Sequence, residues 1–572
     1  MASIVGFDAQ SLERLITERG IRQTWLSIVK TNLIGRADLK YIFSSPSFKG
    51  VRVLDKDLIN GLSIGEISVL YEYSHAVVDS SARKDNGLFF TPDDVAAFMS
   101  SFADRFPKGV WLDPCSGIGN LSWHLVAAQP DPEDFLINNL ILTDKDDLAL
   151  LIARTLLTAA FQRNERRLFH KIEKRFKVFD FLSVADEPTL IHTKGRLDEI
   201  PDHDYVIVNP PYLKTTADPA FETCDSRDLY AYFLENILKT SAGFISVTPQ
   251  SLTNASKFAS LRRLLLSRFS NITILCFDNI PGNLFKGIKF GSNNSNTANS
   301  MRAAIIVALP KPGVPRITSL FRWKTSERDR VFMEIEGFAS EVSLTPEFFP
   351  KVSKVFEGLY RESRSWKRLG SLTSASTTDF PLFVSSSPRY FIAATKAAME
   401  RSSQHIVYFP SEAGRDRAYL AINSSLMYWW WRVRDGGMTL SRETLLSLPL
   451  PNFRSRPELV ALLSESEAVN RVYKQNAGEA RENVKHPMEL VAALNQAICK
   501  PFASQLLLTH ENSEFVQSEI LAQTAQRRRA CWQARRSSEQ PDYRTSPFEQ
   551  IGRLRTTLSY RYVVHQSHTP FC

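Results

Sequence analysis

Short apolar runs alternate with segments of helical spacing through the middle of the chain. From residue 110 onward, apolar runs are separated by longer stretches in which apolar positions recur every three or four residues. Strands and helices that alternate in this way predict a parallel α/β sheet, because buried parallel strands carry apolar residues on both faces. Seven strands are predicted, at 110–113, 140–143, 176–180, 205–208, 244–248, 272–277 and 303–309.

The last two predicted strands are joined differently from the others. A polar loop rich in Asn and Ser, residues 292–300, lies between them in place of a helix. A connection without a crossover helix predicts that the final strand is antiparallel. Pro310, Pro312 and Pro315 then mark the end of the central domain, because proline cannot continue a ladder or a helix.

Different patterns flank this central region. The first part of the chain is predicted to be mostly helical, since apolar residues recur there at helical spacing. After the sheet comes an irregular stretch with many aromatic and basic residues, and then a second helical part that ends in an arginine cluster. The cluster consists of Arg527, Arg528, Arg529, Arg535 and Arg536. The predicted regions are 1–80, 81–315, 345–455 and 456–572.

Charge and cysteine content narrow the class of protein. Seventy Lys and Arg residues against 61 Asp and Glu residues give a net charge of +9, which favours polyanionic partners without identifying one. The six cysteines are scattered without a CxxC pair, so neither a metal site nor a disulfide framework is predicted, and a reducing cytoplasm fits best. No apolar stretch approaches the roughly 18 residues of a membrane span, and the N-terminus does not resemble a signal peptide. We therefore expect a cytoplasmic protein with no membrane partner.

The first predicted strand ends in a glycine turn. In the segment DPCSGIGNL, Gly117 and Gly119 allow the backbone to approach a ligand closely, and a helix begins directly after them. A turn of this kind can also be purely structural. The next strand ends in Asp144, whose carboxylate could accept hydrogen bonds from two ribose hydroxyls. Since the third glycine of a dinucleotide site is missing and Asp113 is present, we expect a cofactor without phosphates that has a cationic amine.

The third strand ends in another acidic residue beside an aromatic one. Asp180 could accept a hydrogen bond from the exocyclic amine of an adenine ring, and Phe181 could lie against its face. An ordinary polar strand end beside a core phenylalanine would give the same pattern.

The fourth strand ends in the tetrad Asn209, Pro210, Pro211 and Tyr212. Consecutive prolines fix φ and donate no hydrogen bonds, so the backbone leaves the sheet rigidly. The Asn209 side-chain oxygen and the Pro210 carbonyl could each bind one N–H of the exocyclic amine of adenine and localise its lone pair. Tyr212 would stack on a base that has been flipped out of the duplex. The alternative is a simple strand-terminating turn.

These motifs resemble the class I S-adenosylmethionine-dependent methyltransferases, in particular the amino-methylating DNA enzymes of the gamma order. Residues 87–99 resemble the motif that precedes the glycine loop, in which Thr91 and Pro92 would contact the methionine part of the cofactor. The lead-in, Leu70–Glu72 and Arg83–Lys84, resembles type II and type IIG modification enzymes. Pro114 then belongs to the cofactor loop, and Phe285 is the candidate for a second aromatic against the flipped base.

The resemblance implies a fold and a function. The fold is α/β, with a Rossmann-like, seven-stranded, mostly parallel sheet, a helical N-terminal region, and a mixed α+β C-terminal region that recognises the target. The activity implied is methylation of adenine N6 in double-stranded DNA, since the tetrad begins with Asn, which in this family favours adenine N6 over cytosine N4. The partner would be a separate restriction endonuclease or defence-system subunit in a bacterial or archaeal cytoplasm.

Three other interpretations stay open from the sequence. The tetrad also occurs in methyltransferases that act on RNA guanine N2 or on protein glutamine, although about 260 residues after the catalytic domain favour DNA recognition. A fused nuclease is disfavoured, because no convincing nuclease motif is found. A non-catalytic DNA-recognition subunit is disfavoured by the intact tetrad. Cys115 resembles the nucleophile of cytosine C5 methyltransferases, but it lies within the cofactor loop. Candidate DNA contacts are Arg389, Tyr390, Lys396, Arg401, Arg415 and Arg417.

Overall fold

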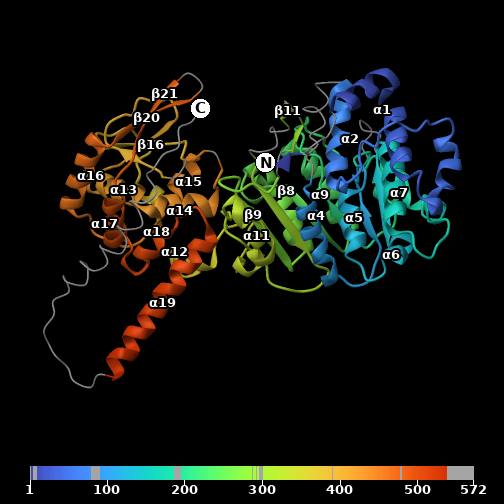
Figure 1. The fold of residues 1–572 in the computed structure, drawn as a ribbon. Coiled ribbons are helices and arrows are strands. Elements are labelled where there is room, and N and C mark those ends of the chain that lie inside the picture. The colour runs from blue at the N-terminus through green and yellow to red at the C-terminus, as the bar shows by residue number, and fades with distance from the viewer. Residues whose placement is uncertain are drawn as a thin grey trace. The chain divides into compact units, whose positions relative to one another are not determined.

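The computed structural model describes residues 2–3, 9–78, 91–185, 195–285, 288–290, 293–294, 301–388, 391–437, 439–476 and 479–537. The chain divides into two units, Met1–Gln517 and Ser518–Cys572. The first unit contains the sheet and both regions that flank it (Figure 1). The second unit contributes most of α19 (Glu514–Ser537), and the side chains of the arginine cluster at 527–536 lie outside the described part of the chain.

A nine-stranded mixed sheet forms the core of the first unit. Its order is β14-β13-β9-β12-β8-β7-β2-β3-β4. The strands are β2 (Trp111–Asp113), β3 (Leu140–Asp144), β4 (Phe176–Val178), β7 (Tyr205–Val208), β8 (Gly243–Pro249), β9 (Ile272–Phe277), β12 (Ala303–Ala308), β13 (Arg316–Ile317) and β14 (Ser340–Glu341). All seven predicted strands are present, and β12 is antiparallel to both of its neighbours, as the sequence predicts.

The predicted count of seven strands is too low. β13 pairs parallel to β9, and β14 pairs antiparallel to β13, so two further strands extend one edge of the sheet. Each has two residues, which is too short to produce a recognisable alternation of apolar and polar positions. β13 begins directly after the prolines that were expected to end the domain.

Alternate residues of each central strand point to opposite faces of the sheet, and both faces are covered. On β7, Tyr205 and Ile207 belong to one apolar cluster, and Val206 and Val208 belong to another. The first cluster includes residues of α4 (Asp93–Ser100), α5 (Asn120–Ala127), α6 (Pro132–Asn138), α7 (Asp147–Phe161) and α11 (Arg328–Glu334). The second includes residues of α9 (Leu229–Thr240) and α10 (Ala259–Arg268). Figure 1 shows α4 and α5 alongside the strands. Burial on both faces explains why these strands read as continuous apolar runs.

The N-terminal region is built from α1 (Ala9–Leu33) and α2 (Ile64–Val78), as its helical spacing predicts. α1 is kinked at Gly20, where φ is 75°. Apolar residues of both helices form one cluster with residues of α7, including Leu148 and Ile152. The N-terminal region therefore packs directly on a helix of the central sheet, next to the carboxyl end of β3.

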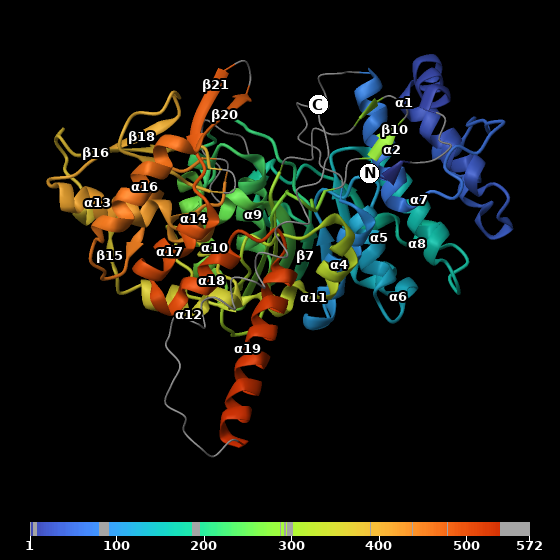
Figure 2. The same cartoon turned by 60° about the vertical axis from the view of Figure 1, so that its left-hand side comes forward.

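Small sheets and helices make up the region after the central sheet (Figure 2). β16 (Pro381–Ser385) pairs with β17 (Ala394–Thr395) and β18 (Gln404–Tyr408), and β15 (Lys367–Arg368) pairs with β19 (Pro449–Leu450). The helices are α12 (Glu357–Ser363), α13 (Glu412–Asn423), α14 (Ser425–Arg434), α15 (Arg442–Leu446), α16 (Pro457–Val469), α17 (Met488–Ile498) and α18 (Ala503–Leu508).

One part of this region differs from the prediction. Residues 471–484 were expected to be helical but form a hairpin of β20 (Arg471–Asn476) and β21 (Glu479–Val484). Its strands are mostly polar, and Val472 and Tyr473 are exposed. On β21 the alternate residues Glu482 and Val484 are buried, but one of the two is charged, so the strand carries no apolar period from which it could be recognised.

Shorter strands also occur. β1 (Ala2–Ser3) pairs with β10 (Ile288–Phe290), which pairs with β11 (Asn293–Asn294), and β5 (Val184–Ala185) pairs with β6 (Gly195–Arg196). Most of the predicted loop at 292–300 lies outside the described residues. Within the described residues, no helix combines the length and apolar character needed to span a membrane.

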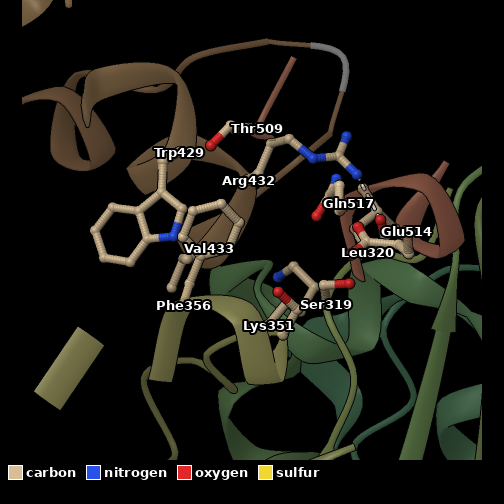
Figure 3. A pocket seen from close by; sticks show the side chains of 11 residues that line it. Ser319, Leu320, Lys351, Phe356, Trp429, Arg432, Val433, Thr509, Glu514 and Gln517 are labelled. Carbon is tan, nitrogen blue, oxygen red and sulfur yellow. Dashed lines mark hydrogen bonds between the residues drawn. The ribbon is translucent and has the colours of Figure 1, made fainter. Parts of the chain in front are cut away.

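A small cavity of about 20 Å³ lies where α14 meets the segments after β13 and β14 (Figure 3). Lys351, Arg432 and Glu514 line it. Burial raises the pKa of Glu514 to about 7, although Arg432 and Arg322 lower it. The carboxyl group therefore binds its proton more tightly in the folded chain than in the unfolded chain, where the pKa is 4.5.

This shift predicts how stability depends on pH. Because the folded-state pKa is raised, the free energy of unfolding is expected to fall by about 3 kcal/mol as pH rises from 4.5 to 7. Glu514→Gln should remove this decrease, because glutamine does not titrate. Urea unfolding of the variant and of the unaltered chain at pH 5 and pH 7 measures how much the free energy of unfolding of each chain changes with pH. Identical pH dependence of the two chains would show that Glu514 is ionised in both states.

Candidate active site

A cavity of about 760 Å³ opens at the carboxyl ends of the central strands. It is lined by the segments that follow β2, β3, β4 and β7, and by one face of α2. The chain goes from β2 outward to β3 and β4 and then returns to β7 on the other side of β2, so this is the point at which strand order reverses. Ligands of open α/β sheets bind at such reversals, because the loops diverge there.

The backbone of the glycine turn is left-handed at both glycines. φ is 52° at Gly117 and 84° at Gly119, which is the residue before the first turn of α5. The Gly117 N–H donates to Asp144 Oδ2 at 2.8 Å, so the turn is tied to the end of β3. This bond brings the two predicted cofactor loops together at the cavity wall.

Gly119 is expected to tolerate no side chain. An added Cβ would come within 3.2 Å of the Ala153 Cβ on α7, and its φ is strained for any L-residue. Gly119→Ala is expected to lower the free energy of unfolding by about 1–3 kcal/mol, measured by chemical denaturation. Gly35→Ala is the control, because no atom would lie near its Cβ and its φ is not positive; equal effects of the two changes would contradict this explanation.

Two predicted cofactor carboxylates that line the cavity have raised pKa values. Asp113 is 1% exposed, and burial raises its pKa to about 7, with the charge of Asp144 adding to the shift while the hydrogen bond from Ser122 opposes it. Burial also raises the pKa of Asp144, despite the N–H groups of Asp146 and Gly117 that donate to it. A cationic group beside these carboxylates would stabilise their ionised forms.

Asp180 and Phe181 also line the cavity, as does Pro114. Asp180 Oδ1 accepts from the Leu182 N–H at 2.9 Å. Phe181 is buried and stacks on Phe233 of α9, with ring centroids 5.3 Å apart. The pair of side chains is therefore placed at the cavity, and its predicted contact with an adenine ring stays a prediction.

The tetrad lies at the end of β7, and Asn209, Pro210 and Pro211 line the cavity. The Asn209 amide makes hydrogen bonds on two sides. Its Nδ2 donates to Thr91 Oγ1 at 2.8 Å, and its Oδ1 accepts from Tyr212 Oη at 2.5 Å. The Tyr212 hydroxyl also lies 2.7 Å from the Val247 carbonyl oxygen.

The two predicted stacking residues lie against each other beside the cavity. The rings of Tyr212 and Phe285 are in edge contact, with centroids 6.5 Å apart, and Phe285 is 1% exposed. Arg328 anchors the segment before Phe285, because its guanidinium donates to the carbonyl groups of Asn283 and Leu284. As placed, Phe285 is a core residue, and stacking on a base would require this segment to move.

Thr91 and Pro92 lie just before α4. Thr91 lines the cavity, and its carbonyl oxygen accepts from Asn120 Nδ2 at 2.7 Å. Pro92 and Gly119 position the neighbouring helices but are not among the lining residues. Residues 87–90 of the same predicted motif, and Arg83 and Lys84 of the lead-in, lie outside the described residues.

One wall of the cavity was not predicted from the sequence, which marked Tyr71 and Glu72 only as part of a resemblance and did not mark Ser68 or His75. Ser68, Tyr71, Glu72 and His75 of α2 line it. Tyr71 donates to Asp146 Oδ2 at 2.6 Å, directly beyond β3. The i, i+3, i+4, i+7 spacing of these four residues puts them on one helix face and was the signal that could have revealed them.

Cys115 lines the cavity within the loop that is predicted to bind the cofactor. Its Sγ donates to the Asn209 carbonyl oxygen at 3.4 Å. Burial, together with the charges of Asp113 and Asp144, raises the pKa of this thiol well above its usual value. A protonated thiol is a poor nucleophile, which agrees with the view that Cys115 does not attack a base.

The lining chemistry favours a cation without phosphates. Five carboxylates line the cavity, and the basic side chains there are those of Lys145 and His75. The carboxylates are Glu72, Asp113, Asp144, Asp146 and Asp180. A polyphosphate would be repelled by this set, whereas a sulfonium or ammonium group would be attracted to it.

The predicted DNA contacts are engaged within the chain. Arg415 and Lys396 both pair with Asp416, and Arg417 donates to the Pro451 carbonyl oxygen. Arg401 bonds with Ser403 and with the Glu482 carbonyl oxygen. Arg389 and Tyr390 lie outside the described residues. The internal contacts of these four basic residues do not mark them as a phosphate-binding surface.

Comparison with solved structures gives matches of low similarity. One is the type IIG restriction endonuclease BpuSI (11% identity, 88% of this chain and 78% of that chain, TM-score 0.39). A second match is DrdV in a complex with DNA, with 14% identity, 56% of this chain and 38% of that chain covered, and a TM-score of 0.36. A third is a type I restriction-modification methyltransferase subunit from Streptococcus thermophilus, with 17% identity, 59% of this chain and 76% of that chain covered, and a TM-score of 0.32. The aligned part of this chain thus spans 38% of the DrdV chain.

Comparison by sequence gives one family. No curated protein matches the chain. Residues 138–281 match the model of the Eco57I restriction-modification methylases. This segment runs from the start of β3 past the end of β9 and contains Asp144, Asp180 and the whole tetrad. Through this part of its length the chain is similar to the Eco57I restriction-modification methylases, which supports a methyltransferase role.

Proposed function

We propose that this chain is a DNA methyltransferase of a restriction-modification or related defence system, which uses S-adenosylmethionine to methylate adenine N6. The observation that carries the proposal is one cavity whose walls combine five carboxylates, among them the buried Asp113, with the Asn209 amide. We assign the acidic lining to a cationic donor and the Asn209 amide to the exocyclic amine that would be methylated. The match of residues 138–281 to a methylase family supports the same reaction class.

Several residues of the chain would hold the cofactor. Asp144 would accept from the ribose hydroxyls, and its carboxylate is already oriented by the Gly117 and Asp146 N–H groups. Asp113 would face the ammonium group, and Asp180 with Phe181 would receive the adenine ring. When bound, S-adenosylmethionine supplies a methyl group on a positively charged sulfur.

The tetrad would prepare the nucleophile. The target amine is weakly nucleophilic, since its lone pair is delocalised into the purine ring. Asn209 Oδ1 and the Pro210 carbonyl oxygen would each accept one N–H and draw the nitrogen toward tetrahedral geometry. The base would have to be flipped from the duplex to reach them. Transfer then needs only positioning, without a covalent intermediate on the protein.

Methyl transfer to DNA can be measured directly. Purified chain is incubated with S-adenosylmethionine labelled in the methyl group and with unmethylated plasmid DNA of mixed sequence. The DNA is then digested to nucleosides for mass spectrometry, and labelled N6-methyl-2′-deoxyadenosine is expected. RNA and protein extracts are the matched alternative substrates.

The product distinguishes this proposal from its rivals. Labelled N4-methyl-2′-deoxycytidine would move the target to cytosine, and label in RNA guanine or protein glutamine would remove DNA as the substrate. Binding of cofactor and DNA with no transfer to any substrate would make the chain a recognition subunit.

A further inference from the structure

Asn209 could present either end of its amide to a substrate, and only one end is useful. An exocyclic amine offers N–H donors, so it needs the Oδ1 acceptor. Rotation of the Asn209 amide by about 180° would place the Nδ2 donor against the N–H donors of the amine. The structure orients the amide with Nδ2 at Thr91 and Oδ1 toward Tyr212. Some group must hold this orientation while the amine is bound.

Tyr212 alone does not fix the orientation of the Asn209 amide. Its hydroxyl has one proton and lies within hydrogen-bonding distance of two acceptors, Asn209 Oδ1 and the Val247 carbonyl oxygen. When an incoming amine takes Oδ1, the hydroxyl can keep the bond to Val247. The contact on the Tyr212 side is therefore exchangeable, whereas the contact on the Thr91 side persists.

Thr91 is itself held firmly. It is 6% exposed, and its carbonyl oxygen accepts from Asn120 Nδ2 at 2.7 Å, at the start of α5. The carbonyl of the next residue, Pro92, accepts from the Ala96 N–H inside α4. The backbone that carries the Thr91 hydroxyl is thus held by the start of α5 on one side and by α4 on the other.

The backbone of Asn209 is fixed separately. Its carbonyl oxygen accepts from Cys115 Sγ at 3.4 Å, and the residue ends the buried strand β7. With the main chain held, the freedom that remains is rotation of the side chain. The bond to Thr91 Oγ1 removes that freedom.

We propose that Thr91 is a positioning residue for methyl transfer, whose hydroxyl oxygen sets the Asn209 amide with Oδ1 toward the target amine. This role acts through Asn209 and differs from the contact with the cofactor that the sequence resemblance implies for Thr91. It rests on the proposed function. Removing the oxygen should slow the transfer step with little effect on cofactor binding.

Two variants at one position test this role. Thr91→Val keeps the shape of the side chain and removes the acceptor, whereas Thr91→Ser keeps the acceptor. Single-turnover methylation of plasmid DNA at saturating S-adenosylmethionine is expected to slow about tenfold or more for Thr91→Val. Thr91→Ser should stay within about threefold of the unaltered chain. Calorimetric titration should give cofactor dissociation constants within about twofold for all three chains.

Each alternative outcome has a distinct meaning. Equal single-turnover rates for the valine and serine variants would overturn the inference, as would a loss confined to the cofactor dissociation constant. Thermal unfolding midpoints identify a variant that is misfolded, and Thr91→Ala then replaces Thr91→Val in the same comparison. No methylation by the unaltered chain would instead refute the proposed function, and the role of Thr91 with it.

Discussion

Asn209→Ala is expected to lower the single-turnover rate of DNA methylation by about 10²–10³-fold. The amide supplies an acceptor at the atom that reacts, and alanine supplies none. Cofactor affinity should change by less than about threefold, because the carboxylates of Asp113 and Asp144 remain in place. Rapid-quench methylation and calorimetric binding of S-adenosylmethionine separate the two effects.

Asn139→Ala provides the matched control for this loss. Asn139 is also a half-buried asparagine whose amide is hydrogen-bonded, to the Gly109 carbonyl oxygen, but it is not among the residues that line the cavity. Its replacement should leave the methylation rate close to that of the unaltered chain. A methylation rate of Asn209→Ala within a factor of three of this control would exclude the tetrad as the site of amine binding.

Asp278→Ala is expected to cause the largest loss of stability, about 3–5 kcal/mol of unfolding free energy. Asp278 is 3% exposed and forms ion pairs with Arg302, Arg322 and Arg432. Arg432 lies on α14, so the cluster joins the end of β9 to the region that follows the central sheet. Without the carboxylate, buried guanidinium groups would repel one another in a medium that solvates them poorly. Urea unfolding followed by fluorescence measures the change.

An exposed ion pair gives the contrast. On α1, Arg14 Nε lies 3.9 Å from Glu18 Oε1, and both side chains are largely exposed. Glu18→Ala should therefore have little effect on the free energy of unfolding. Equal effects of Glu18→Ala and Asp278→Ala would mean that the buried cluster adds nothing beyond surface electrostatics.

The Asp278 cluster also has a pH signature. Burial raises the pKa of Asp278, but the charges of Arg432, Arg302 and Arg322 outweigh burial and hold it below its usual value of 3.8. A lowered folded-state pKa contributes stability above the unfolded-state value, and that stability is lost as pH falls through the folded-state value. The difference in stability between the unaltered chain and Asp278→Ala should therefore be constant at neutral pH and shrink below pH 4.

Much of the central sheet follows from local sequence. Each of the seven predicted strands has a counterpart, because strands that are buried on both faces appear as continuous apolar runs. The antiparallel β12 also follows, since the connection before it carries no helix. β13, β14 and the hairpin β20–β21 do not follow, because they are too short or too polar to leave an apolar period.

The sequence by itself determined the chemistry available at the strand ends: the glycine turn, the carboxylates and the tetrad, each recognisable from neighbouring residues. Only the tertiary structure decided which of these groups meet. It joined Thr91 to Asn209, Tyr71 to Asp146, and Asp278 to Arg432. These contacts join residues 75 to 154 positions apart. Their formation depends on how whole helices pack on the sheet, and local periodicity carries no information about that packing.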